Sequence, residues 1–272
     1  MFRVAKHLMR NLTSSSAADE AVYVSEADGV RSLHLSSPTI QSAMRIRDPF
    51  ALELKYTRGI MCFLLFKTNV KSMLTIGLGG GSVAKYVYKN CPDIVSTIVE
   101  INPKVLQMAR NQFAVPENDA RFDVIEGDGL QYLAEHINAT DVLLIDAFDS
   151  NGIPPNFCSQ DFFDQCSVTL KRDGIFVINL WGSDSNFDIY LQRIEQSFEQ
   201  KVLMMRTGKP GNIVVFGFNK APSSLNVVSL QERAKALASE HEIEFQDFID
   251  RLCNDNQVYQ KCLLFKNDEN AL

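Results

Sequence analysis

Residues 73–82 read MLTIGLGGGS, and this stretch decides the fold. Met73–Ile76 has the apolar and β-branched character of a short buried strand, and Ser82–Lys89 that of a helix. Glycines between them, at Gly77, Gly79, Gly80 and Gly81, let the backbone turn tightly and approach a ligand closely. The stretch predicts a strand, a glycine turn and a helix that bind a nucleoside, although a plain turn or a dinucleotide site also fits.

Downstream of the turn, strand-like and helix-like segments alternate. The expected strands are Val95–Ile101, Arg121–Glu126, Asp141–Asp146 and Ile175–Leu180. Such alternation predicts an α/β fold, a Rossmann-like, doubly wound and mostly parallel sheet. The segments Lys201–Thr207 and Ile213–Asn219 flank a glycine-containing turn, so we expect the sheet to finish with a C-terminal antiparallel hairpin.

The chain divides into four parts by pattern. Residues 1–20 form an N-terminal segment, read as a helix, and residues 21–47 a small β unit whose first hairpin turns at Asp28-Gly29. Residues 48–220 form the Rossmann-like nucleoside-binding domain. Its leading helix is expected to start at Asp48-Pro49 and to run through Phe66. Residues 221–272 have helical periodicity and predict a helical tail.

Composition limits the function. The chain has 272 residues and a formal net charge of −6, which argues against a nucleic-acid partner or a polybasic membrane patch and favours a small, cationic substrate. None of the six cysteines forms a CxxC pair, so no metal site is expected. The apolar run Gly59–Phe66 is too short to span a bilayer, and we expect a cytoplasmic protein.

Acidic residues follow three further strands, at the edge where an open parallel sheet binds its ligands. Glu100 can accept hydrogen bonds from both hydroxyls of a ribose, and Asp128, beside Gly129, from an adenine amine. Asp146 ends a strongly apolar strand, so its carboxylate is a candidate general base, with Asp149 near it. Taken singly, each is also explained as a turn, a helix cap or a surface charge.

Three motifs extend the pattern. They are VEINP at Val99–Pro103, EGDG at Glu126–Gly129 and LLIDAFDSNGIP at Leu143–Pro154. With these motifs the chain resembles the polyamine aminopropyltransferases, the spermidine synthase family, from about Val22 to Asn219. The resemblance implies a small N-terminal β domain, a Rossmann-like domain and a homodimer.

The resemblance also implies roles for single residues. Gln41 would contact the nucleoside from the N-terminal unit, and Glu100 would bind its ribose. The pair Asp128–Gly129 would contact the adenine. Asp146 would be the catalytic base that deprotonates the attacking amine, and Asp149 its partner.

Other positions depart from the family pattern. The family turn reads GGGDGG, and its aspartate, which holds the amine of the donor, corresponds to Gly80, while Ser82 replaces the last glycine. A family triplet that holds the polyamine corresponds to Leu52-Glu53-Leu54, with Glu53 as its remaining polar residue. Ser150 stands where the family has a proline. The nucleoside half of the site is therefore retained, whereas the amine half is altered.

The leading hypothesis is a transferase that moves an aminopropyl group from decarboxylated S-adenosylmethionine to an amine. A methyltransferase that uses S-adenosylmethionine and a nucleoside-binding protein without turnover are the alternatives. No tightly bound cofactor is expected. The nucleoside, whether either of these donors or methylthioadenosine, would be a substrate or ligand.

Overall fold

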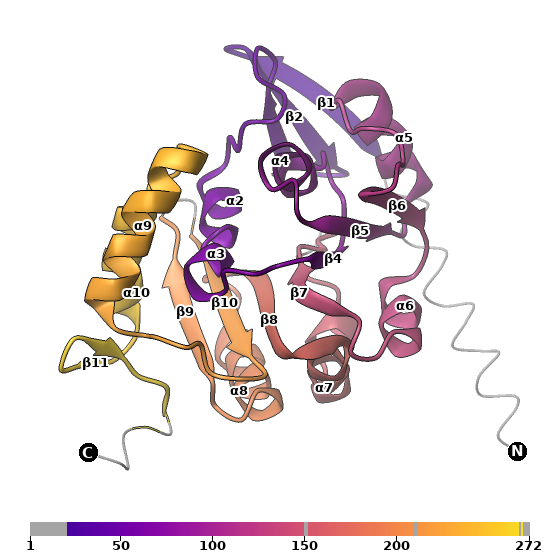
Figure 1. The fold of residues 1–272 in the computed structure, drawn as a ribbon. Helices are drawn as coiled ribbons and strands as arrows, with labels where there is room; N and C mark the ends of the chain where they lie inside the picture. Colours follow the sequence, from indigo (N-terminus) through magenta and orange to yellow (C-terminus); the bar gives the residue numbers. More distant parts are fainter. Residues whose placement is uncertain (1–20, 150–151, 209–210, 267, 269–272) are drawn as a thin grey trace, which may run out of the picture.

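A seven-stranded sheet forms the centre of the molecule, in the order β6-β5-β4-β7-β8-β10-β9 (Figure 1). The computed structural model describes residues 21–149, 152–208, 211–266 and 268. The strands of this sheet are β4 (Ser72–Ile76), β5 (Val95–Glu100), β6 (Phe122–Glu126), β7 (Thr140–Ile145), β8 (Leu170–Trp181), β9 (Val202–Arg206) and β10 (Asn212–Phe218). Strands β6, β5, β4, β7 and β8 are parallel, whereas β10 is antiparallel to both β8 and β9. The predicted sheet and its C-terminal antiparallel hairpin are confirmed.

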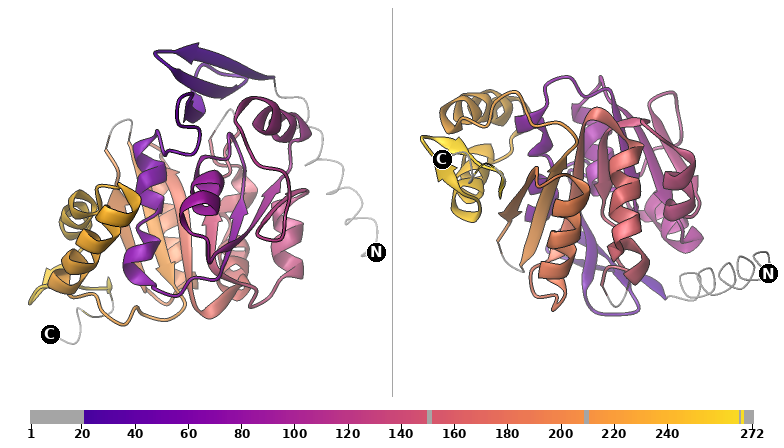
Figure 2. Two further views of the ribbon diagram at one scale, coloured as in Figure 1. Left: turned by 45° about the horizontal axis from the view of Figure 1, so that its top comes forward. Right: turned by 90° about the horizontal axis from the view of Figure 1, so that it is seen from below.

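Helices cover both faces of the sheet because side chains alternate between the faces along each strand. In β7, Val142 and Leu144 join one apolar cluster, and Leu143 and Ile145 join the other. The first cluster includes residues of α2 (Lys55–Ile60), α3 (Phe63–Phe66), α4 (Ser82–Asn90), α9 (Val227–His241) and α10 (Phe245–Asp255). The second includes α6 (Gly129–Glu135), α7 (Gln160–Thr169) and α8 (Phe187–Ser197). Figure 2 shows these two layers, with α5 (Pro103–Gln112) beside β5 and β6.

The N-terminal unit is a separate antiparallel sheet of β1 (Val22–Ala27), β2 (Val30–Leu35) and β3 (Ile40–Arg45). Its first hairpin turns at Asp28 and Gly29, both with positive φ, as predicted. Its apolar face packs on α5 and its C-cap residue, where Leu33 and Met44 cluster with Val105 and Phe113. The packing places this small sheet beyond the carboxyl ends of the large sheet's strands (Figure 2, left).

Two sequence predictions need correction. The leading helix begins at Lys55 rather than Asp48, because the backbone at Asp48 turns back to bond with Arg45 and Ala51. Pro49 therefore belongs to a turn and not to a helix start. The tail contains α9 and α10 but also a short hairpin of β11 (Val258–Tyr259) and β12 (Cys262–Leu263). The N-terminal segment of residues 1–20 lies outside the described residues.

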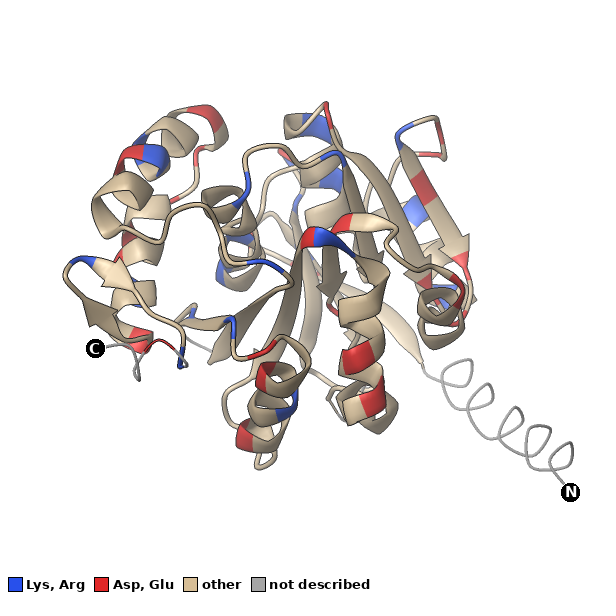
Figure 3. Ribbon diagram, turned by 60° about the horizontal axis from the view of Figure 1, so that its bottom comes forward, with Lys and Arg blue, Asp and Glu red and all other residues tan. Residues whose placement is uncertain are grey.

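Charged residues of both signs are interspersed over the helices in the view of Figure 3. This distribution fits the modest net charge of −6. In the part of the chain that the structure describes, none of the helices is long and apolar enough to cross a bilayer.

Candidate active site

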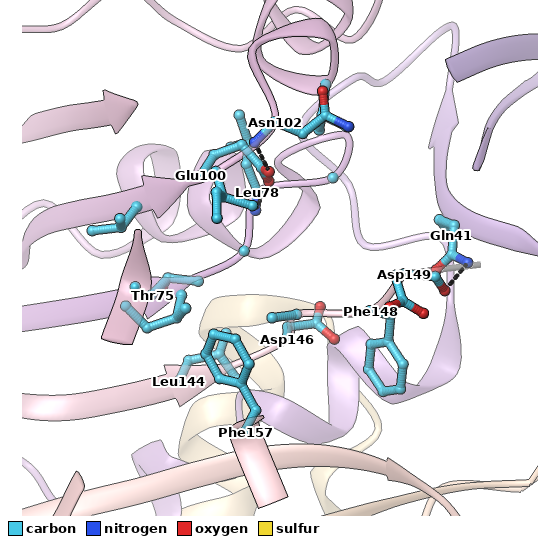
Figure 4. A pocket seen from close by; sticks show the side chains of 18 of the residues that line it. Gln41, Thr75, Leu78, Glu100, Asn102, Leu144, Asp146, Phe148, Asp149 and Phe157 are labelled. Carbon is cyan, nitrogen blue, oxygen red and sulfur yellow. Dashed lines mark hydrogen bonds between the residues drawn. The ribbon is translucent and has the colours of Figure 1, made fainter. Parts of the chain in front are cut away.

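A cavity of about 480 Å³ opens at the carboxyl ends of the parallel strands, beneath the N-terminal unit. Strand order reverses between β4 and β7, which is where an open α/β sheet binds its ligand. The volume of the cavity lies within the range of small-molecule sites. Its walls include Leu33, Gln41, Ser42, Tyr56, Gly77, Leu78, Gly79, Ser82, Glu100, Asn102, Asp128, Gly129, Asp146, Phe148, Asp149 and Phe157 (Figure 4).

The glycine turn lies at the base of this cavity. Gly77 has a φ of 97°, and a Cβ there would lie 2.5 Å from the carbonyl oxygen of Asp146. Only glycine therefore lets the end of β4 approach the end of β7 this closely. Gly77 and Gly79 line the cavity, but Gly80 and Gly81 are not part of its wall.

Gly80 faces the N-terminal unit instead. A Cβ at Gly80 would lie 2.7 Å from Ser42 Oγ and 2.8 Å from Phe113 Cδ1. Ser42 Oγ is in turn 3.1 Å from Ser82 Oγ, and this buried hydroxyl pair links β3 to the start of α4. The space beside Gly80 is therefore filled by neighbours that a side chain would displace.

Glu100 is buried at the end of β5, with 7% of its surface exposed. Its Oε2 accepts a hydrogen bond from the Leu78 amide at 2.9 Å, and its Oε1 accepts one from the Asn102 amide at 2.8 Å. Burial raises the pKa of Glu100, and these amide donors offset part of the rise. The carboxylate therefore ties the glycine turn to the neighbouring strand while lining the cavity (Figure 4).

Asp128 and Gly129 begin α6, and both line the cavity. Asp128 Oδ1 accepts a hydrogen bond from the Leu130 amide at 2.8 Å, so the side chain caps the helix. Gly129 is packed tightly on the sheet, because a Cβ there would lie 2.4 Å from Cγ2 of Ile76. The glycine is thus required by packing between α6 and β4.

We expect Gly129→Ala to lower the free energy of unfolding by about 1–3 kcal/mol, because the new methyl group collides with a buried side chain. Thermal unfolding measures the loss. Gly127→Ala is the matched control two residues away, since its Cβ would meet only ordinary contacts at 3.8 Å. Equal melting temperatures for the two variants would contradict this explanation.

Asp146 follows β7 and lies across the cavity from Glu100 (Figure 4). Its Oδ1 accepts a hydrogen bond from Asn179 Nδ2 at 3.0 Å, and its Oδ2 accepts one from the Tyr56 hydroxyl at 3.4 Å. Burial raises the pKa of Asp146 to about 6, although both hydrogen bonds lower it. A carboxylate with that pKa is ionised at neutral pH and still basic enough to accept a proton.

Asp149, Gln41 and Phe148 form one side of the cavity mouth. Gln41 Nε2 donates to the backbone oxygen of Asp149 at 3.4 Å, which joins the N-terminal unit to the loop after β7 (Figure 4). The ring of Phe148 stacks on Trp181, with 5.3 Å between centroids. Trp181 thus supports the aromatic wall from behind rather than lining the cavity itself.

Two side chains that contact Asp146 were not predicted from the sequence. Tyr56 lies on α2, and its contact with Asp146 depends on where that helix begins. Asn179 is 2% exposed within the apolar strand β8, and a buried amide in such a strand is a signal that sequence reasoning could have used. Glu53, expected at the amine site, instead binds Arg45 at 2.8 Å and is not in the cavity wall.

Within the described residues, no three His, Cys, Asp or Glu side chains are grouped to hold a metal ion. The cavity wall contains four carboxylates, those of Glu100, Asp128, Asp146 and Asp149. Among its described residues it has no lysine, arginine or histidine. A ligand with positive charge is therefore favoured over an anionic one.

The fold, with its cavity at the reversal of strand order, is of the methyltransferase-like class. A sequence profile of the spermine/spermidine synthase domain matches residues 53–207, and a polyamine aminopropyltransferase of Chromobacterium violaceum is 38% identical over 248 residues, covering 91% of this chain and 95% of that protein. The chain therefore belongs to the spermine/spermidine synthase family, and it is a transferase.

Another relative and two solved structures are also similar to this chain. A polyamine aminopropyltransferase of Neisseria meningitidis is 37% identical over 243 residues, covering 89% of this chain and 92% of that one. The solved structure of a spermidine synthase in complex with the transition-state analogue AdoDATO has a TM-score of 0.63 at 19% identity, over 85% of each chain. Human methyltransferase-like protein 13, in complex with SAH, has a TM-score of 0.63 at 25% identity, over 70% of this chain and 93% of that one.

Proposed function

We propose that this chain transfers an aminopropyl group from decarboxylated S-adenosylmethionine to an amine, releasing methylthioadenosine. The observation that carries the proposal is the acidic cavity, with four carboxylates and no basic side chain among the described residues of its wall. Both substrates are cations, a sulfonium with a primary amine and an acceptor amine. Intact S-adenosylmethionine would bring a carboxylate into the same negative field, which disfavours it.

Each carboxylate takes a role in this proposal. Glu100 binds the ribose hydroxyls at the end of β5, and Asp128 accepts from the adenine amine. Gln41 contacts the nucleoside from the N-terminal unit, and Asp149 contributes charge for the acceptor amine. Asp146 is the general base, supported by its raised pKa and by its two fixed hydrogen-bond donors.

The proposed reaction is a single displacement. Asp146 takes the proton of the acceptor ammonium, which frees the lone pair of its nitrogen. That lone pair attacks the methylene carbon of the aminopropyl group next to the sulfonium, and the carbon–sulfur bond breaks with its electrons passing to sulfur. The chain would mainly hold the two substrates in line and take the proton, so orientation supplies much of the rate.

A specific feature favours a second candidate, methyl transfer from intact S-adenosylmethionine. The wall beside the glycine turn holds the neutral hydroxyls of Ser42 and Ser82, and Gly80 contributes no carboxylate there. Hydroxyl groups can donate to a carboxylate, whereas an aspartate would repel it. The homologous aminopropyltransferases and the four carboxylates of the cavity make this the weaker candidate.

A donor competition decides between the candidates. We expect the protein to convert decarboxylated S-adenosylmethionine and one member of a diamine and polyamine panel into methylthioadenosine and a longer amine. Chromatography with mass detection follows both products. Intact S-adenosylmethionine should yield neither methylthioadenosine nor a methylated product. Formation of S-adenosylhomocysteine would favour methyl transfer, and nucleoside binding without any product would contradict the proposed reaction.

A further inference from the structure

Asp146 is connected to a polar chain that crosses two neighbouring strands behind the cavity. Asn179, on β8, donates through Nδ2 to Asp146 Oδ1 at 3.0 Å. Asn212, the first residue of β10, donates through Nδ2 to Asn179 Oδ1 at 3.0 Å. Asn179 and Asn212 are 2% and 8% exposed, and neither amide lines the cavity. Two buried amides are therefore lined up behind the carboxylate.

The order of donors and acceptors in this chain matters. An asparagine side chain presents NH2 on one side and oxygen on the other, and rotating it by half a turn exchanges them. Only the orientation with Nδ2 toward Asp146 lets Asn179 donate to Oδ1 of the carboxylate. In the structure the NH2 group of Asn212 faces the oxygen of Asn179, and this contact favours that orientation of the Asn179 amide.

The backbone holds Asn212 in place. Its carbonyl oxygen accepts hydrogen bonds from both the amide and the hydroxyl of Thr207, each at 3.0 Å. These bonds close the hairpin between β9 and β10, so the donor that orients Asn179 is part of the sheet and not of a loose loop. The orientation of the Asn179 amide behind the cavity is thus set by a residue two strands away from Asp146.

We propose that Asn212 is a positioning residue that keeps the Asn179 amide turned toward Asp146 and thereby holds Asp146 as an ionised base. This inference rests on the proposed role of Asp146 in the reaction. It adds a residue outside the substrate cavity that sets the pH range in which the base works.

The surroundings of Asp146 make its ionisation sensitive to this chain. Burial raises its pKa, whereas the hydrogen bonds from Asn179 and Tyr56 lower it. Tyr56, from α2, is the titratable group in contact with the carboxylate, and burial together with the charge of Asp146 raises the pKa of Tyr56 well above its usual value. Tyr56 therefore stays a neutral donor, and Asp149 is the other acid on the same loop. If Asn179 turned its oxygen toward Asp146, the protonated carboxyl would be favoured.

The test is Asn212→Leu, which removes the amide but keeps a side chain of similar branched shape. We expect the acid limb of the pH–rate profile to move up by about one pH unit, so that kcat falls about fivefold at pH 6 and changes less than about twofold at pH 8.5. KM for the nucleoside should not change. Asn212→Ser, whose side chain is too short to reach Asn179, gives the same readout without added bulk and serves if the leucine variant does not fold.

Asn219→Leu is the matched control, because its partly buried amide follows the same strand but bonds to the backbone oxygens of Ser167, Leu170 and Lys171. It should lose stability without moving the pH profile. A folded Asn212 variant with the wild-type acid limb would overturn the inference.

A titration makes the inference independent of turnover. Carbon-13 NMR of aspartate carboxyls, with Asp146→Asn to assign the signal, reports the pKa of Asp146 directly. A shift of the Asp146 pKa in Asn212→Leu without any aminopropyl transfer by the wild type would support the positioning role and contradict only the proposed reaction. Unchanged titration would contradict the positioning role itself.

Discussion

Asp146→Asn should abolish turnover while leaving nucleoside binding nearly intact. The asparagine has nearly the same shape and can still accept from Asn179, but it cannot take up a proton from the attacking amine. Loss of a general base typically costs about 100- to 10,000-fold in rate. We expect kcat to fall within this range or below detection, with the dissociation constant for methylthioadenosine changed less than about threefold. Turnover at the wild-type rate would refute the assignment of Asp146.

The wild-type enzyme should show the same group in its pH dependence. With a pKa of about 6, Asp146 becomes an active base as the pH rises through that value, so kcat should rise between about pH 5 and 7. A carboxyl whose pKa is raised by folding stabilises the folded state at low pH, and this contribution is lost as the pH rises through 6. Asp146→Asn should therefore melt at a higher temperature than the wild type at pH 8, with a smaller difference near pH 5.

Asp141→Asn provides the matched control for this experiment. Asp141 lies at the opposite end of the same strand, where its Oδ2 accepts from the Lys71 and Ser72 amides and from Lys171 Nζ. Removing its charge should lower the melting temperature, because these donors lose an ionised acceptor. The catalytic rate of the folded protein should remain normal. The two substitutions thus separate damage to the strand from damage to the reaction.

Much of the fold could be predicted because local signals agreed with the global arrangement. The alternation of apolar strands and helices gave the parallel sheet, and carboxylates at successive strand ends had to meet at one edge. Gly77, Glu100, Asp128, Asp146 and Asp149 all line the same cavity. The roles of these residues toward a ligand remain predictions.

Other parts depended on contacts between distant segments. Asp48-Pro49 has the pattern of a helix start, yet hydrogen bonds to the preceding strand make it a turn, and so α2 presents Tyr56 to the cavity. In the sequence, Gly80 indicated only that the aspartate of the family pattern is missing. Its neighbours Ser42 and Phe113 belong to segments that are far away in the sequence. No local sequence pattern predicts such neighbours, because these residues come into contact only when the sheet and the N-terminal unit have assembled.

Glu100→Gln should weaken nucleoside binding by about 10- to 100-fold, because the substitution removes the ionised acceptor from both the backbone amides and the ribose hydroxyls. The carboxylate now accepts from the Leu78 and Asn102 amides. A glutamine has one acceptor oxygen, and its NH2 group must face either an amide N–H or the ribose. We expect the KM for the nucleoside to rise while kcat at saturation changes little, the reverse of the Asp146→Asn result. Isothermal calorimetry measures the dissociation constant for methylthioadenosine directly.

Glu126→Gln is the control for this substitution because Glu126 is the register partner of Glu100 on β6 and is exposed. An exposed change of this kind alters stability by less than about 0.5 kcal/mol, so binding should stay at the wild-type level. Glu100→Gln removes a buried charge, but its NH2 group would face the amide N–H of Leu78 or Asn102, and this lost hydrogen bond should lower the melting temperature. If it lowered stability but left affinity unchanged, Glu100 would be a structural acceptor for the turn and not a ligand of the ribose. A loss of affinity that persists well below the melting temperature, with Glu126→Gln unaffected, would instead place the nucleoside on Glu100.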